Sequence, residues 1–529
     1  MHNSYLFIIL LSASIAFGTF SSNHNPTFGR GTKPHIVYLL ADDLGWNNVG
    51  WRNPDMITPV LDDMKHNGIE LDRHYTALVC GPTRSSLMTG RVPIHVREVN
   101  NNVAIQDIGP ELEMTFLSEK MQEAGYETHY YGKWHLGMGT PEYLPINRGF
   151  NKSLFFFSGA TDYNTQARDN RVCAGELFVD LWEDDNFSTK NGTYMGFTFN
   201  DAAVDAIENH DVNKPMFLFV SFPHPHSPLQ VPQEYVDRYA DNLPVNINRQ
   251  LYQAMVTFMD ESIGNITQAL KDKGMYDDTL IVFSSDNGGP TPFRGLESFT
   301  NGGASNFPLK GGKQSDWEGG IRTVGLVGGG IIPNKMRGTV QKGYVHVADW
   351  YSTFCFLAGV DPEDTRAALV GLPPIDSKNM WGLFSGQQRF SYRIEIPISS
   401  NPTFRGWLEE PTGFINFIRG PYKFLVGEGI PFAGHTGPVY PNATEVYLTQ
   451  TMVQDCPNGC LYNIWTDPEE RFDLAPTRPF LLHLMKWRSR TLEAGAFRRT
   501  YLDPAVEACD AARDRGGWWG PFDLTSTAP

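Results

Sequence analysis

The stretch HIVYLLADD, residues 35–43, combines a short apolar run with two carboxylates that follow it directly. The same pattern recurs three more times along the chain, since an apolar, β-rich run ends abruptly in polar residues. These runs lie at 128–131, 216–222 and 280–285, and they are followed by Gly-Lys133-Trp-His135, Pro-His224-Pro-His226 and Asp286-Asn287. Apolar runs of this length are typical of strands that are buried on both faces.

Segments with helical character lie between these runs. TPVLDDMKHNG, residues 58–68, has Pro59 near its start and a glycine at its end, and ELEMTFLSEKMQEAG, residues 111–125, also ends in glycine. Strands that alternate with helices predict an α/β fold with a mostly parallel sheet flanked by helices. Ligands of such sheets bind at the carboxyl ends of the strands, so we expect the polar residues after the four runs to meet at one edge.

The character of the sequence changes near residue 385. GFINFI at 413–418, a turn Arg-Gly-Pro and YKFLV at 422–426 predict an antiparallel hairpin, and an apolar helix follows around residues 481–487. We therefore predict a large domain over residues 33–385 and a smaller C-terminal α+β domain with an antiparallel sheet over residues 386–529.

The amino-terminal residues indicate export. The apolar run LFIILLSASIAF at 6–17 predicts a signal peptide over residues 1–20, with a short buried helix as the alternative. No later stretch is apolar enough to span a membrane. We expect a glycoprotein of the secretory pathway, either extracellular or lysosomal. The glycosylation acceptor sites are Asn151, Asn186, Asn191, Asn265 and Asn442.

The charge of the chain limits its partners. The net charge is -16, which argues against a nucleic-acid surface, since phosphate binding requires clustered Lys and Arg. An anionic substrate must therefore be bound by a local group of positive side chains. Among the six cysteines, Cys456 and Cys460 flank a turn and are spaced to close a small disulfide, with no histidine nearby to complete a metal site instead.

The polar residues after the runs suggest a metal site. Asp42, Asp43, Asp286 and Asn287 offer hard oxygen ligands, which suit Ca²⁺ or Mg²⁺ and not zinc. Each pair alone would be read as turn residues, but two pairs on one sheet edge favour a cation. Basic side chains, most of them after the same runs, suggest a binding site for an anion. Lys and His that gather around a cation can bind an anionic substrate and donate protons to it. The candidates are Lys133, His135, His226 and Lys313, with His224 as a hydrogen-bonded bystander.

VCGPTRSSLMTGR, residues 79–91, places Cys80 at the start of a short predicted helix with Pro82 in its first turn. A thiolate nucleophile is one interpretation. However, a soft thiolate is a poor match for a hard, oxygen-bound cation. A disulfide or a buried free thiol would leave Pro82 and Arg84 unexplained.

These residues resemble the signature of the type I sulfatases, in which Cys-x-Pro-x-Arg is followed by Leu-x-Thr-Gly-Arg. In that family a formylglycine-generating enzyme oxidises the cysteine during secretion to Cα-formylglycine, an aldehyde. Thr83 stands where serine is commoner in the family. Further segments are similar to sulfatase blocks in family order, and together they most resemble the arylsulfatase B branch, the N-acetylgalactosamine-4-sulfatase-like enzymes. They are PHIVYLLADDLGWNNVGW, YETHYYGKWHLG, HSPLQVPQEY, SSDNGG, GGKQSDWEGGIR and, more weakly, LYNIWTDPEERFDL and GGWWGPF.

The resemblance implies an alkaline-phosphatase-like fold, with residues 33–385 as the catalytic domain. It also implies one Ca²⁺, held by Asp42, Asp43, Asp286, Asn287 and the formylglycine made from Cys80. Further roles are implied for the basic residues. Arg84 and Lys133 would steady the hydrated aldehyde, His226 and Lys313 would bind the sulfate and protonate the leaving oxygen, and His135 would be the base.

The implied reaction is hydrolysis of a sulfate monoester, either an aryl sulfate or a sulfated sugar. Two other functions remain open. A phosphomonoester or phosphonate hydrolase of the same superfamily would usually have a Ser or Thr nucleophile and two zinc ions. A catalytically silent, sulfatase-like glycan-binding protein would be expected to lack Cys80 or a metal ligand, whereas every such position is filled here.

Overall fold

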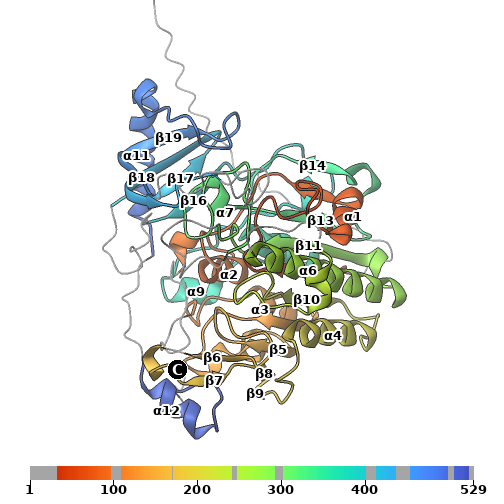
Figure 1. Cartoon of the computed structure of the whole chain (residues 1–529). Coiled ribbons are helices and arrows are strands. Elements are labelled where there is room, and N and C mark those ends of the chain that lie inside the picture. The colour runs from red at the N-terminus through yellow and green to blue at the C-terminus, as the bar shows by residue number, and fades with distance from the viewer. Residues whose placement is uncertain are drawn as a thin grey trace, which may run out of the picture.

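A central sheet organises the larger part of the molecule (Figure 1). The computed structural model describes residues 33–96, 109–169, 171–240, 247–291, 302–400, 413–435, 453–497 and 505–523. Among these residues the sheet has ten strands, in the order β14-β2-β13-β11-β1-β10-β4-β5-β8-β9. Their bounds are β1 His35–Ala41, β2 Ile69–Leu71, β4 Glu127–Lys133, β5 Lys152–Phe156, β8 Trp182–Glu183, β9 Asn186–Phe187, β10 Met216–Ser221, β11 Thr279–Ser285, β13 Gly325–Gly328 and β14 Thr339–Gln341.

The four strands predicted from the apolar runs lie side by side at the centre of this sheet. β1 pairs in parallel with β10 and β11, and β4 pairs in parallel with β10 and β5. Toward the edges the direction changes, since β13 runs antiparallel to β11 and β8 runs antiparallel to β5. The mostly parallel α/β sheet is therefore confirmed.

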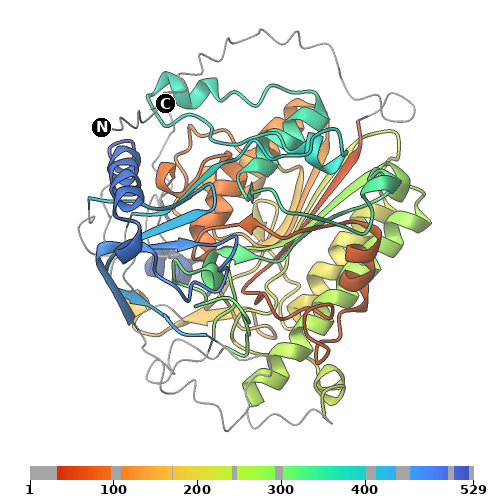
Figure 2. The same ribbon diagram turned by 90° about the horizontal axis from the view of Figure 1, so that it is seen from above.

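Helices cover both faces of the sheet. Side chains of β1 alternate, so that Tyr38 and Leu40 belong to one core cluster and Val37 and Leu39 to the other. The first cluster includes residues of α2 Cys80–Thr89, α3 Leu117–Glu123 and α8 Asp349–Ala358; the second includes residues of α1 Pro59–Asn67, α4 Met195–Glu208 and α6 Ile247–Asp272. Seen from above, α1 and α6 lie together on one side of the sheet (Figure 2).

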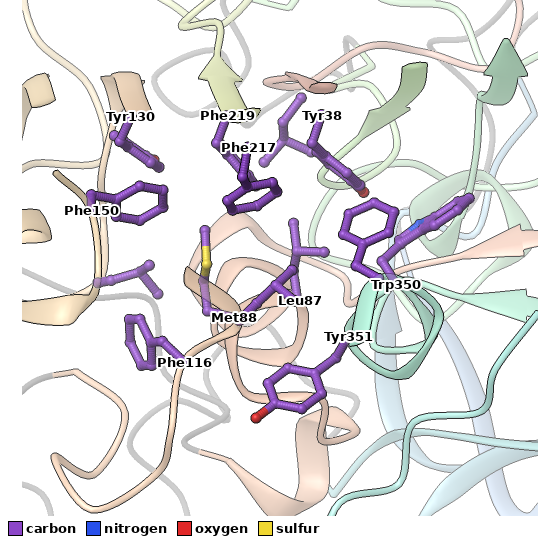
Figure 3. Close-up of a cluster of buried hydrophobic side chains, with 14 of the residues drawn as sticks. Tyr38, Leu87, Met88, Phe116, Tyr130, Phe150, Phe217, Phe219, Trp350 and Tyr351 are labelled. Carbon is purple, nitrogen blue, oxygen red and sulfur yellow. The ribbon is translucent and has the colours of Figure 1, made fainter. Parts of the chain in front are cut away.

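The core under α2 is rich in aromatic side chains. Phe219 of β10 stacks on Tyr38 of β1, with ring centroids 5.1 Å apart. Leu87 and Met88 of α2 reach the same cluster of buried side chains (Figure 3). All ten residues of α2 are buried, so the helix that starts at Cys80 is fixed firmly against the sheet.

The helix expected over residues 111–125 is shorter than predicted, because it begins only at Leu117. The residues before Leu117 make other contacts instead of helical ones. Thr115 donates hydrogen bonds from its backbone nitrogen and its hydroxyl to the carboxylate of Asp364. The Glu119 carboxylate accepts from the Phe116 backbone nitrogen at 2.7 Å and caps the helix at that point.

A second, antiparallel sheet is built from residues after 385. It has the order β16-β17-β18-β19, with bounds Glu395–Ser399, Asn416–Arg419, Tyr422–Pro431 and Val453–Asn463. The predicted hairpin is β17–β18, and the predicted helix is α11 Pro479–Glu493. Lys423 of β18 is fully buried and forms an ion pair with Glu318 of α7 Glu318–Ile321 at 3.2 Å. This contact ties the antiparallel sheet to α7, and the boundary near residue 385 stays a prediction.

The described C-terminal segment returns to the large sheet. The disulfide Cys173–Cys509 links α12 Glu507–Asp514 to the region of the hairpin β6 Ala167–Asp169 and β7 Leu177–Val179. In Figure 1 α12 lies beside these strands. Trp519 donates its backbone N–H to the Val179 carbonyl at 2.9 Å, so the segment 505–523 holds the hairpin in place.

Smaller elements complete the described chain: β3 His74–Tyr75, β12 Arg322–Thr323 and β15 Val345–His346 in a three-stranded sheet, and the helices α5 Gln233–Asp237, α9 Thr365–Leu369 and α10 Trp381–Phe384. The predicted disulfide Cys456–Cys460 is present. Cys80 and Cys355 are free and buried. Within the described residues no helix is long and apolar enough to cross a membrane.

The predicted export signals are only partly covered by the structure. The proposed signal peptide and the acceptor Asn442 lie outside the described residues. The other four acceptor asparagines, Asn151, Asn186, Asn191 and Asn265, are exposed.

Candidate functional site

The polar residues that follow the central strands meet at the carboxyl edge of the sheet, as the parallel pairing requires. Asp42 follows β1, and its carboxylate oxygen Oδ2 lies 2.7 Å from the Lys133 Nζ atom at the end of β4. Asp286 follows β11, and its backbone nitrogen donates to the Ala41 carbonyl at 3.0 Å. All three side chains are buried.

Arg84 of α2 contacts residues at the ends of three strands, β11, β4 and β10. Its guanidinium donates to the Asp286 carboxylate at 2.9 and 3.2 Å. It also donates to the Lys133 carbonyl at 2.9 Å and to the Ser221 hydroxyl at 2.6 Å. Although burial opposes the charged form, Asp286 and Asp42 raise the pKa of Arg84, so the guanidinium is a permanent cation of the site.

Asp43 brings a second group of predicted residues together. The Lys313 Nζ atom lies 2.6 Å from its carboxylate, the Asn287 Nδ2 atom donates to it at 2.7 Å, and His226 Nε2 lies 3.6 Å away. Asp43 has a left-handed backbone, with φ at 72°, which turns its carboxylate toward these partners. Burial alone would raise its pKa, but Lys313 and His226 outweigh it and lower the pKa of Asp43 to about 2.

Cys80 stands between these two groups as the first residue of α2. Its sulfur and one ligand atom each of Asp42, Asp43 and His226 lie within 4.8 Å of one another. The thiol is only 1% exposed, and burial is the main reason why its pKa is raised, so as a cysteine it would be a poor nucleophile.

His135 lies two residues beyond the end of β4 and is buried. Its ring packs so closely on Gly159 that a Cβ atom there would come within 2.9 Å of His135 Cε1. His224 has a different environment: its Nε2 atom shares a hydrogen bond of 2.7 Å with the Tyr194 hydroxyl, and its ring stacks on Phe258. His224 is therefore the structural bystander that the sequence predicted.

The structure also brings in two side chains that the sequence reasoning missed. Ser221 accepts from Arg84, and its position near the end of the predicted strand 216–222 was an available signal. Burial lowers the pKa of Arg168 of β6, whereas Asp180, Asp169 and the Cys80 side chain act in the opposite direction, and its guanidinium donates to the Ala160 carbonyl. No sequence pattern marks Arg168, because the fold of residues 158–169 alone places it there.

The oxygen-rich part of the site fits a hard cation. Asp42 Oδ1 and Asn287 Oδ1 are buried and have no hydrogen-bond partner within the described part of the chain. Burial, and after it repulsion from the neighbouring Asp286, raises the pKa of Asp42 to about 8. A divalent cation among these oxygens would coordinate Asp42 Oδ1 and Asn287 Oδ1 and offset the repulsion between the Asp42 and Asp286 carboxylates.

Comparisons with known proteins bear on the same residues. The family model described as Sulfatase matches residues 34–360. Arylsulfatase J of Mus musculus is 33% identical over 514 residues, which cover 93% of this chain and 80% of that protein. N-acetylgalactosamine-6-sulfatase of Canis lupus familiaris is 30% identical over 505 residues, which cover 92% of this chain and 90% of that protein.

Solved structures resemble the whole described fold. The structure of Ps i-CgsB in complex with k-i-k-neocarrahexaose has a TM-score of 0.71 at 25% identity and covers 92% of this chain and 98% of that chain. The phosphonate monoester hydrolase of Agrobacterium radiobacter has a TM-score of 0.54 at 16% identity, over 87% of this chain and 95% of that chain. The second likeness shows a shared fold alone.

Proposed function

Because the chain belongs to the sulfatase family and has its alkaline-phosphatase-like fold, we propose that it hydrolyses sulfate monoesters at residue 80, after Cys80 has been converted to Cα-formylglycine. The placement of Cys80 carries the proposal. This cysteine is buried, free of any disulfide, and starts a helix beside Asp42, Asp43 and His226.

Asp42, Asp43, Asp286 and Asn287 would hold one Ca²⁺. The cation would neutralise negative charge that gathers between the carboxylates and the bound sulfate. The unpartnered oxygens of Asp42 and Asn287 support this assignment. Arg84 keeps Asp286 in position from the side of α2, and Lys133 does the same for Asp42 from the end of β4.

The formylglycine, in its hydrated form, would supply the nucleophilic oxygen. Lys133 and Arg84 are the cations next to that position, and both are buried and fixed by several contacts. Preorganised charges of this kind stabilise a developing negative charge without having to move during the reaction.

Lys313 and His226 are the candidates for binding the sulfate. His226 shares a 2.6 Å hydrogen bond between its Nδ1 atom and the Ser227 carbonyl. A carbonyl only accepts, so Nδ1 carries a hydrogen and Nε2 faces the site. From there Nε2 faces the position of the sulfate beside the Lys313 ammonium. Lys313 would donate to the sulfate oxygens, and His226 would protonate the leaving oxygen from Nε2 once its ring has taken up a second proton. His135, at the far side of the Lys133 loop, would act as the base.

The substrate class follows from the family and from one neighbour. Ps i-CgsB was solved with an oligosaccharide, k-i-k-neocarrahexaose, and shares 25% identity with this chain. We propose a sulfated sugar or a small aryl sulfate as substrate. Maturation would require the formylglycine-generating enzyme in the secretory pathway, with an extracellular or lysosomal destination. The arylsulfatase B-like placement stays a prediction.

The two free cysteines provide a matched test. Cys80→Ala should lower the rate of sulfate release from an aryl sulfate by about 10³-fold or more, as losses of catalytic nucleophiles do. Cys355→Ala is the control, because Cys355 lies in the core on α8, away from the site. Equal turnover by both variants would overturn the proposal. Binding of sulfated sugar without turnover would favour the silent glycan-binding protein, and cleavage of phosphonate esters alone would favour the phosphonate hydrolase.

A further inference from the structure

A second group of metal-ligand side chains lies at the amino end of β4, at the opposite end of the strand from Lys133. It consists of Glu127, His129 and His210, each of which offers one ligand atom, and these atoms all lie within 4.8 Å of one another. Glu127 and His129 are two residues apart on one strand and therefore project from the same face. His210 comes from the loop that joins α4 to β10.

The two imidazole rings face one carboxylate. His129 Nε2 lies 3.5 Å from one Glu127 oxygen, and His210 Nδ1 lies 3.5 Å from the other. The side chains of His129 and His210 are 6% and 0% exposed, whereas that of Glu127 is 36% exposed. The group is therefore buried on the histidine side and open to solvent on the carboxylate side.

The hydrogen bonds of the rings fix which nitrogens face inward. His210 Nε2 lies 2.9 Å from the Lys214 carbonyl, which only accepts, so Nε2 carries a hydrogen and Nδ1 of the neutral ring presents its lone pair. His129 Nδ1 lies 3.2 Å from the Tyr131 hydroxyl, which can accept from it, and Nε2 then presents its lone pair to the group. Within the part of the chain that the structure describes, the Glu127 oxygens 3.5 Å away are the polar atoms that face His129 Nε2 and His210 Nδ1, and neither nitrogen makes a shorter hydrogen bond.

This arrangement is unfavourable without a cation. The buried lone pair of His210 Nδ1 points at a carboxylate and repels it, and a buried polar atom without a partner destabilises the folded chain. A metal ion bound by all three groups removes both costs. Histidines whose other ring nitrogen is held by a carbonyl or a hydroxyl are the usual form of metal-binding histidine in proteins.

The backbone holds the group in place. The Glu127 nitrogen donates to the Pro215 carbonyl at 2.9 Å, which ties the loop of His210 to the start of β4. His35 of β1 closes one side, with its ring 5.7 Å from that of His210. Lys152, whose charge acts on His129, is paired with Asp184 at 2.9 Å.

We propose that Glu127, His129 and His210 bind Zn²⁺. Two imidazole nitrogens and one carboxylate oxygen are a ligand set that zinc takes, with a fourth position left for water on the exposed side. Glu127 and Lys133 are six residues apart along β4, so the zinc site lies about 20 Å from the oxygen-rich site. The bound ion would fasten the α4–β10 loop to the sheet, and this inference does not depend on the proposed function.

The test is titration of the metal-free full-length chain with ZnCl₂, followed by calorimetry. Excess CaCl₂ should be present to occupy the oxygen-rich site, and Cys80→Ala should be the parent, so that the thiol near His226 takes no zinc. His210→Gln and Glu127→Gln remove one ligand each. His483→Ala is the matched control, since His483 is exposed on α11.

We expect one Zn²⁺ per chain in the parent and in His483→Ala, with affinity about 100-fold lower or worse in His210→Gln and Glu127→Gln. Zinc should also raise the Tm of the parent and not that of these two variants. If His210→Gln does not fold, the half-exposed Glu127→Gln decides the question. Absence of zinc binding in the parent, or equal affinity in the parent and the ligand variants, would overturn the proposal.

Discussion

The two ends of β4 carry opposite kinds of chemistry. At the carboxyl end Lys133 enters a buried group of carboxylates, with further cations from Arg84 and Lys313. At the amino end the partly exposed Glu127 faces the imidazole nitrogens of two buried histidines. One strand therefore presents a hard, oxygen-rich set at one end and a nitrogen-rich set at the other, and these sets select different metals.

The difference also concerns what holds each group together. The carboxyl-end residues already satisfy much of one another's charge, since each of Asp42, Asp43 and Asp286 has a cationic partner within 3 Å. The amino-end nitrogens have no such partner within the described residues. A variant at the carboxyl end should therefore leave metal binding at the amino end unchanged.

The largest effect is expected from Asp286→Asn. It removes a proposed Ca²⁺ ligand and leaves the buried Arg84 unpaired, so sulfate release should fall about 10³-fold or more, and the unpaired charge should cost about 3–5 kcal/mol of stability. Zinc affinity at the amino end should not change. Asp63→Asn, exposed on α1, is the control for turnover and Tm. Wild-type turnover by Asp286→Asn would contradict the proposed role of Asp286 as a Ca²⁺ ligand.

Lys313→Ala comes next. Loss of one preorganised cation at the sulfate position should lower kcat/KM by about 10²- to 10³-fold. It should also raise the pKa of Asp43, because Lys313 is its closest cationic partner. Steady-state kinetics with an aryl sulfate measure the effect, with the exposed Lys335→Ala as control. A loss confined to Tm would mean that Lys313 is only structural.

A third comparison uses the two disulfides. Cys173–Cys509 spans 336 residues and Cys456–Cys460 spans 4, so the first restricts the unfolded chain far more. The double variant Cys173→Ala/Cys509→Ala should lose about 2–4 kcal/mol of stability, more than Cys456→Ala/Cys460→Ala. Denaturant unfolding of both variants tests this. Equal losses would contradict the role of the C-terminal segment in holding the β6–β7 hairpin.

The smallest effect is expected from Arg168→Gln. Arg168 is a partly buried cation on that hairpin, and we propose that it contacts the substrate next to the sulfate. KM for a sulfated oligosaccharide should rise about tenfold, which is the effect of losing one charge-assisted hydrogen bond. KM for a small aryl sulfate should change little, because that substrate is too small to reach Arg168. Arg513→Gln, exposed on α12, is the control. Equal KM values in both variants would show that Arg168 does not contact the substrate.

The carboxyl end could be predicted from the sequence because its residues directly follow the strands. Asp42, Lys133 and Asp286 stand at or just beyond strand ends, and parallel pairing alone brings such positions together. The amino end could not be predicted. His210 reaches His129 only through the way the α4–β10 loop closes, and no short-range pattern records that closure.

Two other features show the same limit. The pairing of Cys173 with Cys509 depends on the C-terminal segment returning across the fold, which spacing does not reveal. The predicted start of α3 was wrong, because Asp364, which lies far along the chain, accepts hydrogen bonds from Thr115 and keeps that residue out of the helix. Local patterns therefore predicted strands and their ends well, and they failed where distant segments meet.

The most direct measurement is mass spectrometry of the peptide HYTALVCGPTR, residues 74–84, from the chain secreted by a host that also makes formylglycine-generating enzyme. The account predicts an aldehyde at residue 80, and an unchanged thiol at Cys355 in the same sample. A free thiol at residue 80 in all copies, from a host that converts another sulfatase normally, would contradict the central claim.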